Sequence, residues 1–164
     1  KMEEKRSLSY LFSMIINLKQ LFSITGESKD FDYEIGSEEL SGIKGCSFSS
    51  PISVKGRIYN KAGVVYLKYN LSFSMNSQCD RCLKEMDIPY SFDCDHIVVP
   101  SVSGDNDEYI VADGENLELN EIAVTDMLLQ IPTKTLCSED CKGLCMVCGA
   151  DLNEGDCEHQ ISES

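Results

Sequence analysis

"ISVKGRIYNKAGVVYLKYNLSFSM", residues 52–75, contains two runs in which apolar and polar side chains alternate. A period of two places every second side chain on the same face of a β-strand. Between the runs, Asn60 and Gly63 suit the backbone of a tight turn. The stretch therefore predicts two antiparallel strands that share one buried face, made of Ile52, Val54, Ile58, Val65, Leu67, Tyr69, Leu71, Phe73 and Met75.

The flanking segments extend this sheet. Residues 86–99 predict a third long strand that Pro100 closes, with Ile88, Tyr90, Phe92 and Cys94 on one face. Shorter strands are expected at 31–35 and 109–114, and a helix at 117–132 that ends at Pro132. A second, amphipathic surface helix is predicted from the helical spacing of Leu8, Leu11, Phe12, Ile15, Leu18 and Phe22.

These elements indicate an α+β fold: an antiparallel β meander or barrel-like core with one or two helices and a C-terminal zinc-knuckle appendix. We expect residues 14–132 to form the core and residues 133–164 to form a cysteine-rich, zinc-binding tail packed on it. Residues 1–13 are interpreted as an N-terminal extension or a misassigned start.

The charge balance indicates which class of partner the chain can bind. With 28 acidic and 14 basic side chains the formal net charge is −14, which disfavours sequence-independent binding of nucleic acid and favours a basic protein partner. The apolar run at 7–18 is interrupted by Asn17 and followed by no signal-peptide cleavage pattern, so a cytoplasmic protein without a membrane span is expected.

The nine cysteines are the main chemical signal, because a reducing compartment leaves them available for metal. The preferred division assigns zinc to two sets of four ligands. The clasp set combines Cys79 and Cys82, between two strands, with Cys137 and Cys141 of the tail. The tail set is local and consists of Cys145, Cys148, Cys157 and His159. A single ion held by Cys137, Cys141, Cys145 and Cys148 is an alternative that spacing leaves open.

Other cysteine and histidine readings are weaker. The pair Cys79 and Cys82 could be a redox dithiol, although no helix begins there to stabilise a thiolate. Cys46 and Cys94 are expected to be small buried apolar residues, and His96 a hydrogen-bonded residue rather than a ligand.

No phosphate-binding loop, nucleophile elbow or H-E-x-x-H motif occurs in the sequence. Both zinc sets are filled by protein ligands, so catalysis is not expected. A thiol redox or nuclease activity is the enzymatic alternative. No small-molecule substrate is expected.

The segments "CDRCLKEMDIPYSF" (79–92) and "ELNEIAVTDMLLQIPTKTLCSEDCKGLCMVCGADLNEGDC" (118–157) resemble the YceD family, the bacterial large ribosomal RNA subunit accumulation proteins, in the form found in Gram-positive bacteria. Two departures are His159 in place of a terminal cysteine and Met146 in place of a common proline. The resemblance implies a role in accumulation of 23S rRNA and in assembly of the large ribosomal subunit.

Together with the acidity, this resemblance leads us to expect a ribosomal protein or a pre-50S particle as the partner. Direct contact with rRNA is the alternative, through Arg81, Lys84, Lys134 and Lys142. Arg81 and Lys84 could equally neutralise the thiolates beside them.

Overall fold

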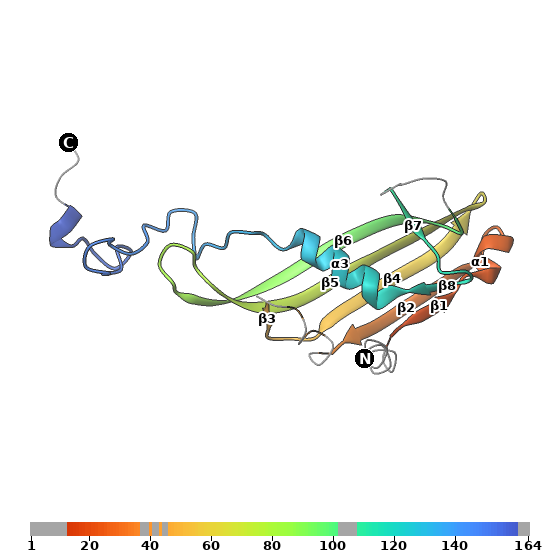
Figure 1. Ribbon diagram of the computed structural model, residues 1–164, viewed down its shortest axis with the longest axis horizontal. Coiled ribbons are helices and arrows are strands. Elements are labelled where there is room, and N and C mark those ends of the chain that lie inside the picture. Colours follow the sequence, from red (N-terminus) through yellow and green to blue (C-terminus); the bar gives the residue numbers. More distant parts are fainter. Residues whose placement is uncertain (1–12, 37–39, 41–42, 44–45, 102–107, 161–164) are drawn as a thin grey trace, which may run out of the picture.

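The computed structural model describes residues 13–36, 40, 43, 46–101 and 108–160. Its main body is a six-stranded sheet (Figure 1). The strands follow the order β2 (Ser28–Ile35), β4 (Ile52–Lys61), β5 (Val64–Gln78), β6 (Glu85–Val99) and β7 (Tyr109–Val111), and β3 (Ser47–Phe48) pairs with β5. The sheet is open and does not close into a barrel, while the α+β class and the antiparallel meander are confirmed.

The β4–β5 hairpin forms where residues 52–75 predict it. Ala62 and Gly63 both have positive φ, 54° and 87°, which matches the right-handed twist of a two-residue hairpin loop. Asn60, only 3% exposed, accepts a hydrogen bond from the Gly63 amide and donates one to the Leu21 carbonyl at 2.7 Å. The turn is therefore fixed by a buried side chain as well as by its glycine.

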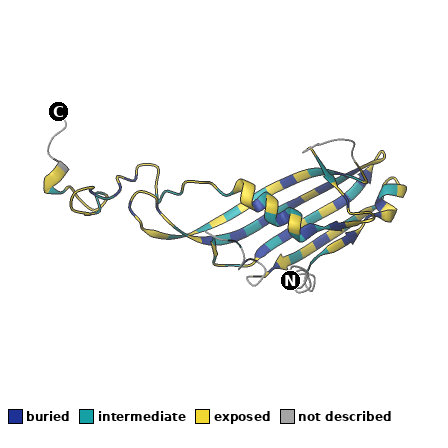
Figure 2. Ribbon diagram, in the orientation of Figure 1, coloured by how far each residue is buried: buried dark blue, intermediate teal, exposed yellow. Residues whose placement is uncertain are grey.

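Buried and more exposed residues alternate along the strands, as the colouring of Figure 2 shows, so one face of the sheet is covered and the other is open to solvent. The predicted inward residues of β4 and β5 are all buried. β6 pairs with β5 from Glu85 to Val98, and its buried and half-buried side chains alternate with exposed ones as far as Asp95. β7 pairs with the last three residues of β6 in the parallel direction.

Helix α3 (Leu119–Gln130) lies across the inward face (Figure 1). It buries Leu119, Ala123 and Met127. The helix predicted at 117–132 is confirmed, except that its first residues belong to strand β8 (Asn116–Glu118) and the helix ends two residues before Pro132. None of the helices in the described part of the chain is long and apolar enough to cross a membrane.

The predicted N-terminal helix is wrong where the structure describes it, and residues 8–12 lie outside the described residues. Ile15–Asn17 forms strand β1, which pairs with β8, and only Lys19–Ser23 is helical (α1). The Leu18 amide donates to the Glu115 carbonyl, and Leu119 donates to Met14. These long-range backbone bonds hold the segment extended despite its helical spacing. A small 3-10 helix, η2 (Glu158–Gln160), lies in the tail.

Candidate metal centres

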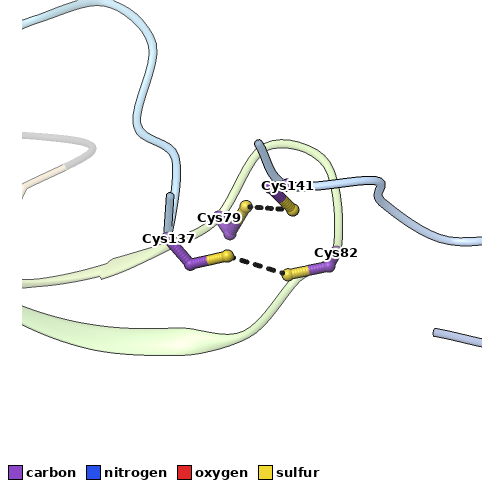
Figure 3. A group of neighbouring side chains, drawn as sticks. All are labelled: Cys79, Cys82, Cys137 and Cys141. Atoms are coloured by element: carbon purple, nitrogen blue, oxygen red, sulfur yellow. Dashed lines mark hydrogen bonds between the residues drawn. The ribbon is translucent and has the colours of Figure 1, made fainter. Parts of the chain in front are cut away.

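The clasp set brings four sulfur atoms from two distant segments together (Figure 3). Cys79 and Cys82 lie in the turn from β5 to β6, and Cys137 and Cys141 lie in the tail after α3. All four sulfurs lie within 4.8 Å of one another. The Sγ–Sγ distance is 3.7 Å between Cys79 and Cys141, and 3.6 Å between Cys82 and Cys137.

These distances fit a tetrahedral metal ion. Four sulfurs about 2.3 Å from one zinc ion would stand about 3.8 Å apart along each edge of the tetrahedron. Cys79, Cys82 and Cys141 are at most 7% exposed. The donors are soft and number four, which is the ligand set that structural zinc prefers.

Backbone amides surround the first sulfur of the turn. Burial raises the pKa of the Cys79 thiol, but the amides of Cys82, Cys137 and Arg81 more than offset this and set the pKa at about 6. The turn ends at Leu83, which has a positive φ of 59°. The left-handed residue after the second cysteine reverses the chain so that the amides face the sulfur.

Hydrogen bonds join the tail to this turn independently of the sulfurs. The Asp80 amide donates to the Thr135 carbonyl, and the Thr135 amide donates to the Asp80 carboxylate at 2.6 Å. The Leu144 amide donates to the Arg81 carbonyl at 3.1 Å. Leu136 and Leu144 pack against the cysteines in a small cluster separate from the main core. Hydrogen bonds and apolar packing therefore hold the turn and the tail together without any contribution from the sulfur atoms.

The tail set lies farther along the chain and is more exposed. The ligand atoms of Cys145, Cys148, Cys157 and His159 also lie within 4.8 Å of one another. Cys145 repeats the arrangement of Cys79, because the amides of Cys148 and Val147 outweigh its burial and hold the pKa of its thiol at about 6. Gly149, with φ 74°, occupies the position that Leu83 has in the first turn.

The structure thus brings together the two preferred sets and separates Cys137 and Cys141 from Cys145 and Cys148. Cys46 is half-buried, and Cys94 is buried beside the Gln130 amide, 3.7 Å away. His96 is hydrogen-bonded, with its Nε2 2.6 Å from the Asp126 carboxylate, which also accepts the Tyr69 hydroxyl. Cys46, Cys94 and His96 belong to neither donor set.

The basic residues around the clasp have different environments. Arg81 donates its Nη1 to the carbonyl oxygens of Cys141, at 2.7 Å, and Glu139, at 3.4 Å. Lys84, Lys134 and Lys142 are exposed.

Sequence reasoning missed the side chain of Asn153, which donates to the Cys141 sulfur. Asn153 belongs to the motif on which the family resemblance rests, but neither the motif nor its spacing indicates a contact with Cys141.

Sequence reasoning also missed a second basic group, on the outward face of β4 and β5. There Lys55 pairs with Asp32, Arg57 with Asp30, and Lys68 with Asp95. All three pairs are exposed, so each cation is already neutralised at the surface.

The open sheet and the two donor sets define a β-sheet protein with a cysteine-rich tail, whose two clusters have the geometry to hold a metal ion. The family model of the large ribosomal RNA subunit accumulation protein YceD matches residues 67–164, and the chain belongs to this family. It is 26% identical over 149 residues to the "Uncharacterized protein YlbN" of Bacillus subtilis (strain 168), covering 87% of each chain. No solved structure matches. Family membership gives the chain a ribosome-related role.

Proposed function

We propose that the chain is a non-enzymatic, zinc-stapled factor for accumulation of 23S rRNA, which acts in the cytoplasm by binding a basic ribosomal protein or a pre-50S particle. Family membership supports the ribosomal part of this proposal. The observation that carries the binding mode is the charge around the clasp and the tail, where carboxylates outnumber basic side chains.

Zinc fits both donor sets. Cys79, Cys82, Cys137 and Cys141 would hold one ion, and Cys145, Cys148, Cys157 and His159 the other. Bound zinc would supply structural cross-links, because four protein donors leave no position for a reacting water. The chain itself orients the sulfurs through the amides of the two turns. Each set would therefore add folding free energy to a segment with a small apolar core.

Charge favours a basic partner over direct contact with rRNA. The turn 79–84 and the tail 133–164 together carry four basic residues, Arg81, Lys84, Lys134 and Lys142, and eight acidic ones, Asp80, Glu139, Asp140, Asp151, Glu154, Asp156, Glu158 and Glu163. Arg81 is bonded to the tail backbone. Seven thiolates around two divalent ions would make the region more negative still. Such a surface attracts Lys- and Arg-rich proteins and repels phosphate.

Affinity capture from cell lysate tests this proposal. The tagged chain is used as bait at low and at high salt, each with and without ribonuclease, and captured proteins are identified by mass spectrometry. We expect ribosomal proteins that survive ribonuclease and are released by salt, because charge drives their binding. A captured set without ribosomal proteins contradicts the proposal, and capture that ribonuclease abolishes supports direct rRNA binding instead.

A pair of charge-reversal variants sharpens the test. Glu139→Lys with Asp140→Lys reverses two exposed carboxylates beside the clasp. Glu34→Lys with Asp113→Lys reverses two exposed carboxylates outside the tail and makes the same change in net charge. We expect the first pair to reduce capture at least several-fold and the second to leave it nearly unchanged.

A further inference from the structure

We propose that the two metal sets are coupled through Asn153, so that a metal ion in the tail set raises the affinity of the clasp set for its own ion. The inference rests on the proposed metal binding and not on the ribosomal role. Its physical basis is the loop 149–156. Ligands of the tail set flank this loop, and its central residue Asn153 contacts the clasp set.

Asn153 contacts the clasp set directly. Its Nδ2 donates to the sulfur of Cys141 at 3.5 Å, and its Oδ1 accepts the amide of Lys142 at 2.8 Å. The carboxylate of Asp151 accepts both the side-chain and the backbone N–H of Asn153, at 2.6 and 2.9 Å. The amide group therefore has one orientation, in which an N–H points at a sulfur that would bind metal.

The backbone of the same loop lies on the segment that carries Cys141. The Leu152 amide donates to the Gly143 carbonyl at 2.9 Å, and the Cys145 amide donates to the Ala150 carbonyl at 2.8 Å. Leu144 forms an isolated bridge with Asp151. The loop from 149 to 156 thus folds back onto residues 141–145.

The ends of this loop are ligands of the tail set. Cys148 precedes it and Cys157 follows it, and most of its residues are exposed. No residue of this loop belongs to either buried apolar cluster, so hydrogen bonds hold it and a metal ion bound to both ends would restrict it further. That restriction would hold Asn153 against Cys141 before the clasp ion arrives.

A hydrogen bond to a coordinating sulfur stabilises its charged form and fixes its direction, and removing such a partner lowers metal affinity about 10–100-fold. Coupling between two binding sites is reciprocal. Loading the clasp set would therefore raise the affinity of the tail set by the same factor.

Cobalt(II) titration of the metal-free, reduced full chain tests the coupling. A four-thiolate site and a three-thiolate, one-imidazole site give different cobalt absorption, so each set is followed separately, with chelator competition to measure affinity and native mass spectrometry to count ions. In the unaltered chain we expect fewer one-ion molecules than independent sites would give.

A double-mutant cycle isolates the role of Asn153. Asn153→Ala should lower clasp affinity about 10-fold or more in the unaltered background. In a background that lacks the tail set, Cys148→Ser with Cys157→Ser, the same substitution should change clasp affinity less than about 3-fold, because the loop is no longer held. Glu154→Ala, an exposed neighbour in the same loop, is the matched control and should change neither affinity.

The outcomes are distinguishable. Equal effects of Asn153→Ala in both backgrounds, or one-ion molecules at the level of independent sites, would overturn the coupling and leave the metal sites standing. Cobalt bound at neither set would overturn the metal proposal and the coupling together. Circular dichroism of every variant checks that the sheet is intact, since its core is separate from the clasp cluster.

Discussion

The guanidinium of Arg81 donates to the carbonyl oxygen of Cys141 at 2.7 Å, and the Arg81 carbonyl in turn accepts the amide of Leu144. One residue of the β5–β6 turn is thereby bonded through both its side chain and its backbone to the tail. Its role in the folded chain is to align the two halves of the clasp set. Lys84, three residues later, is exposed.

The first prediction concerns these two basic residues. Arg81→Ala removes the side-chain bonds to the Cys141 and Glu139 carbonyl oxygens and keeps the backbone bond from Leu144. It should weaken the clasp by about 1–2 kcal/mol, or roughly 10-fold in metal affinity. Lys84→Ala should leave that affinity within about 2-fold. Chelator competition measures both, and amide hydrogen exchange over residues 136–142 reports the same loosening. Equal effects of the two substitutions would mean that Arg81 acts only through its charge.

The second prediction compares glycines of the tail. Gly143 and Gly149 both have positive φ, 79° and 74°, but only at Gly143 is a Cβ crowded, 3.0 Å from the Arg81 carbonyl oxygen. Alanine at either position adds about 1–2 kcal/mol of backbone strain. Gly143→Ala should lower clasp affinity more than Gly149→Ala lowers tail-set affinity. Gly155→Ala has neither problem and should change neither affinity in the same cobalt titration.

The third prediction concerns the centre of the sheet. A Cβ on Gly56 would lie 2.4 Å from the Cβ of Tyr69 and 2.3 Å from the Lys68 carbonyl oxygen. Gly56→Ala must therefore push β4 away from β5 and should cost about 3 kcal/mol of unfolding free energy. Gly36→Ala meets nothing within 4 Å and should change stability by no more than about 0.5 kcal/mol. Urea denaturation of the two variants checks this, and equal midpoints would show that the sheet relaxes freely at Gly56.

The fourth prediction is a pH dependence at the contact between helix and sheet. Hydrogen bonding to Asp126 raises the pKa of His96 above 6.5. Burial raises the pKa of Asp126, but hydrogen bonds from His96 and Tyr69 outweigh it and hold the value below 3.8.

The signs of these shifts define a window of stability. The contribution of His96 is fully present below pH 6.5 and is lost as pH rises through its raised folded value. The contribution of Asp126 is present above pH 3.8 and is lost as pH falls through its lowered folded value. The contact should therefore be strongest between about pH 4 and 6.5.

Nuclear magnetic resonance titration of the His96 ring measures this shift. Asp126→Asn should return the pKa of His96 toward its ordinary value. Asp95→Asn is the comparison and should lower the pKa of His96 less, because that carboxylate acts on His96 only by its charge and pairs with Lys68 on the outward face. A larger effect of Asp95→Asn than of Asp126→Asn would refute the assignment.

Local patterns in the sequence predicted the hairpin, the long third strand and the helix before Pro132, because the side chains that repeat there are the ones that the sheet buries. The prediction of an N-terminal helix was wrong because long-range pairing, and not the local spacing, determines this segment. Ile15 and Leu18 fit a helical spacing, yet Ile16 and Leu18 are the buried pair, and the strand is held by bonds to residues 115–119. Pairing across about a hundred residues leaves no local signal.

The preferred division of the cysteines followed from the two C-x-x-C pairs and the four ligands that zinc takes. Spacing alone left a single set of Cys137, Cys141, Cys145 and Cys148 open, and only the structure separates them. The role of Asn153 could not be predicted from the sequence, since its contact with Cys141 depends on how the loop folds back. The bonding of Arg81 to the tail and the parallel direction of β7 likewise depend on tertiary packing and not on spacing.

The clasp set also determines the order in which parts of the chain can fold during synthesis. Its partners are 62 residues apart in one pair and 55 in the other, with all of β6 and α3 between them. Because synthesis proceeds from the N-terminus, Cys79 and Cys82 leave the ribosome long before Cys137 and Cys141 exist. Closing so long a loop carries an entropic cost that the intervening sheet and helix reduce by folding first. The clasp set is thus completed late in the synthesis and folding of each chain. Until then, the thiols of Cys79 and Cys82 lack the partners Cys137 and Cys141.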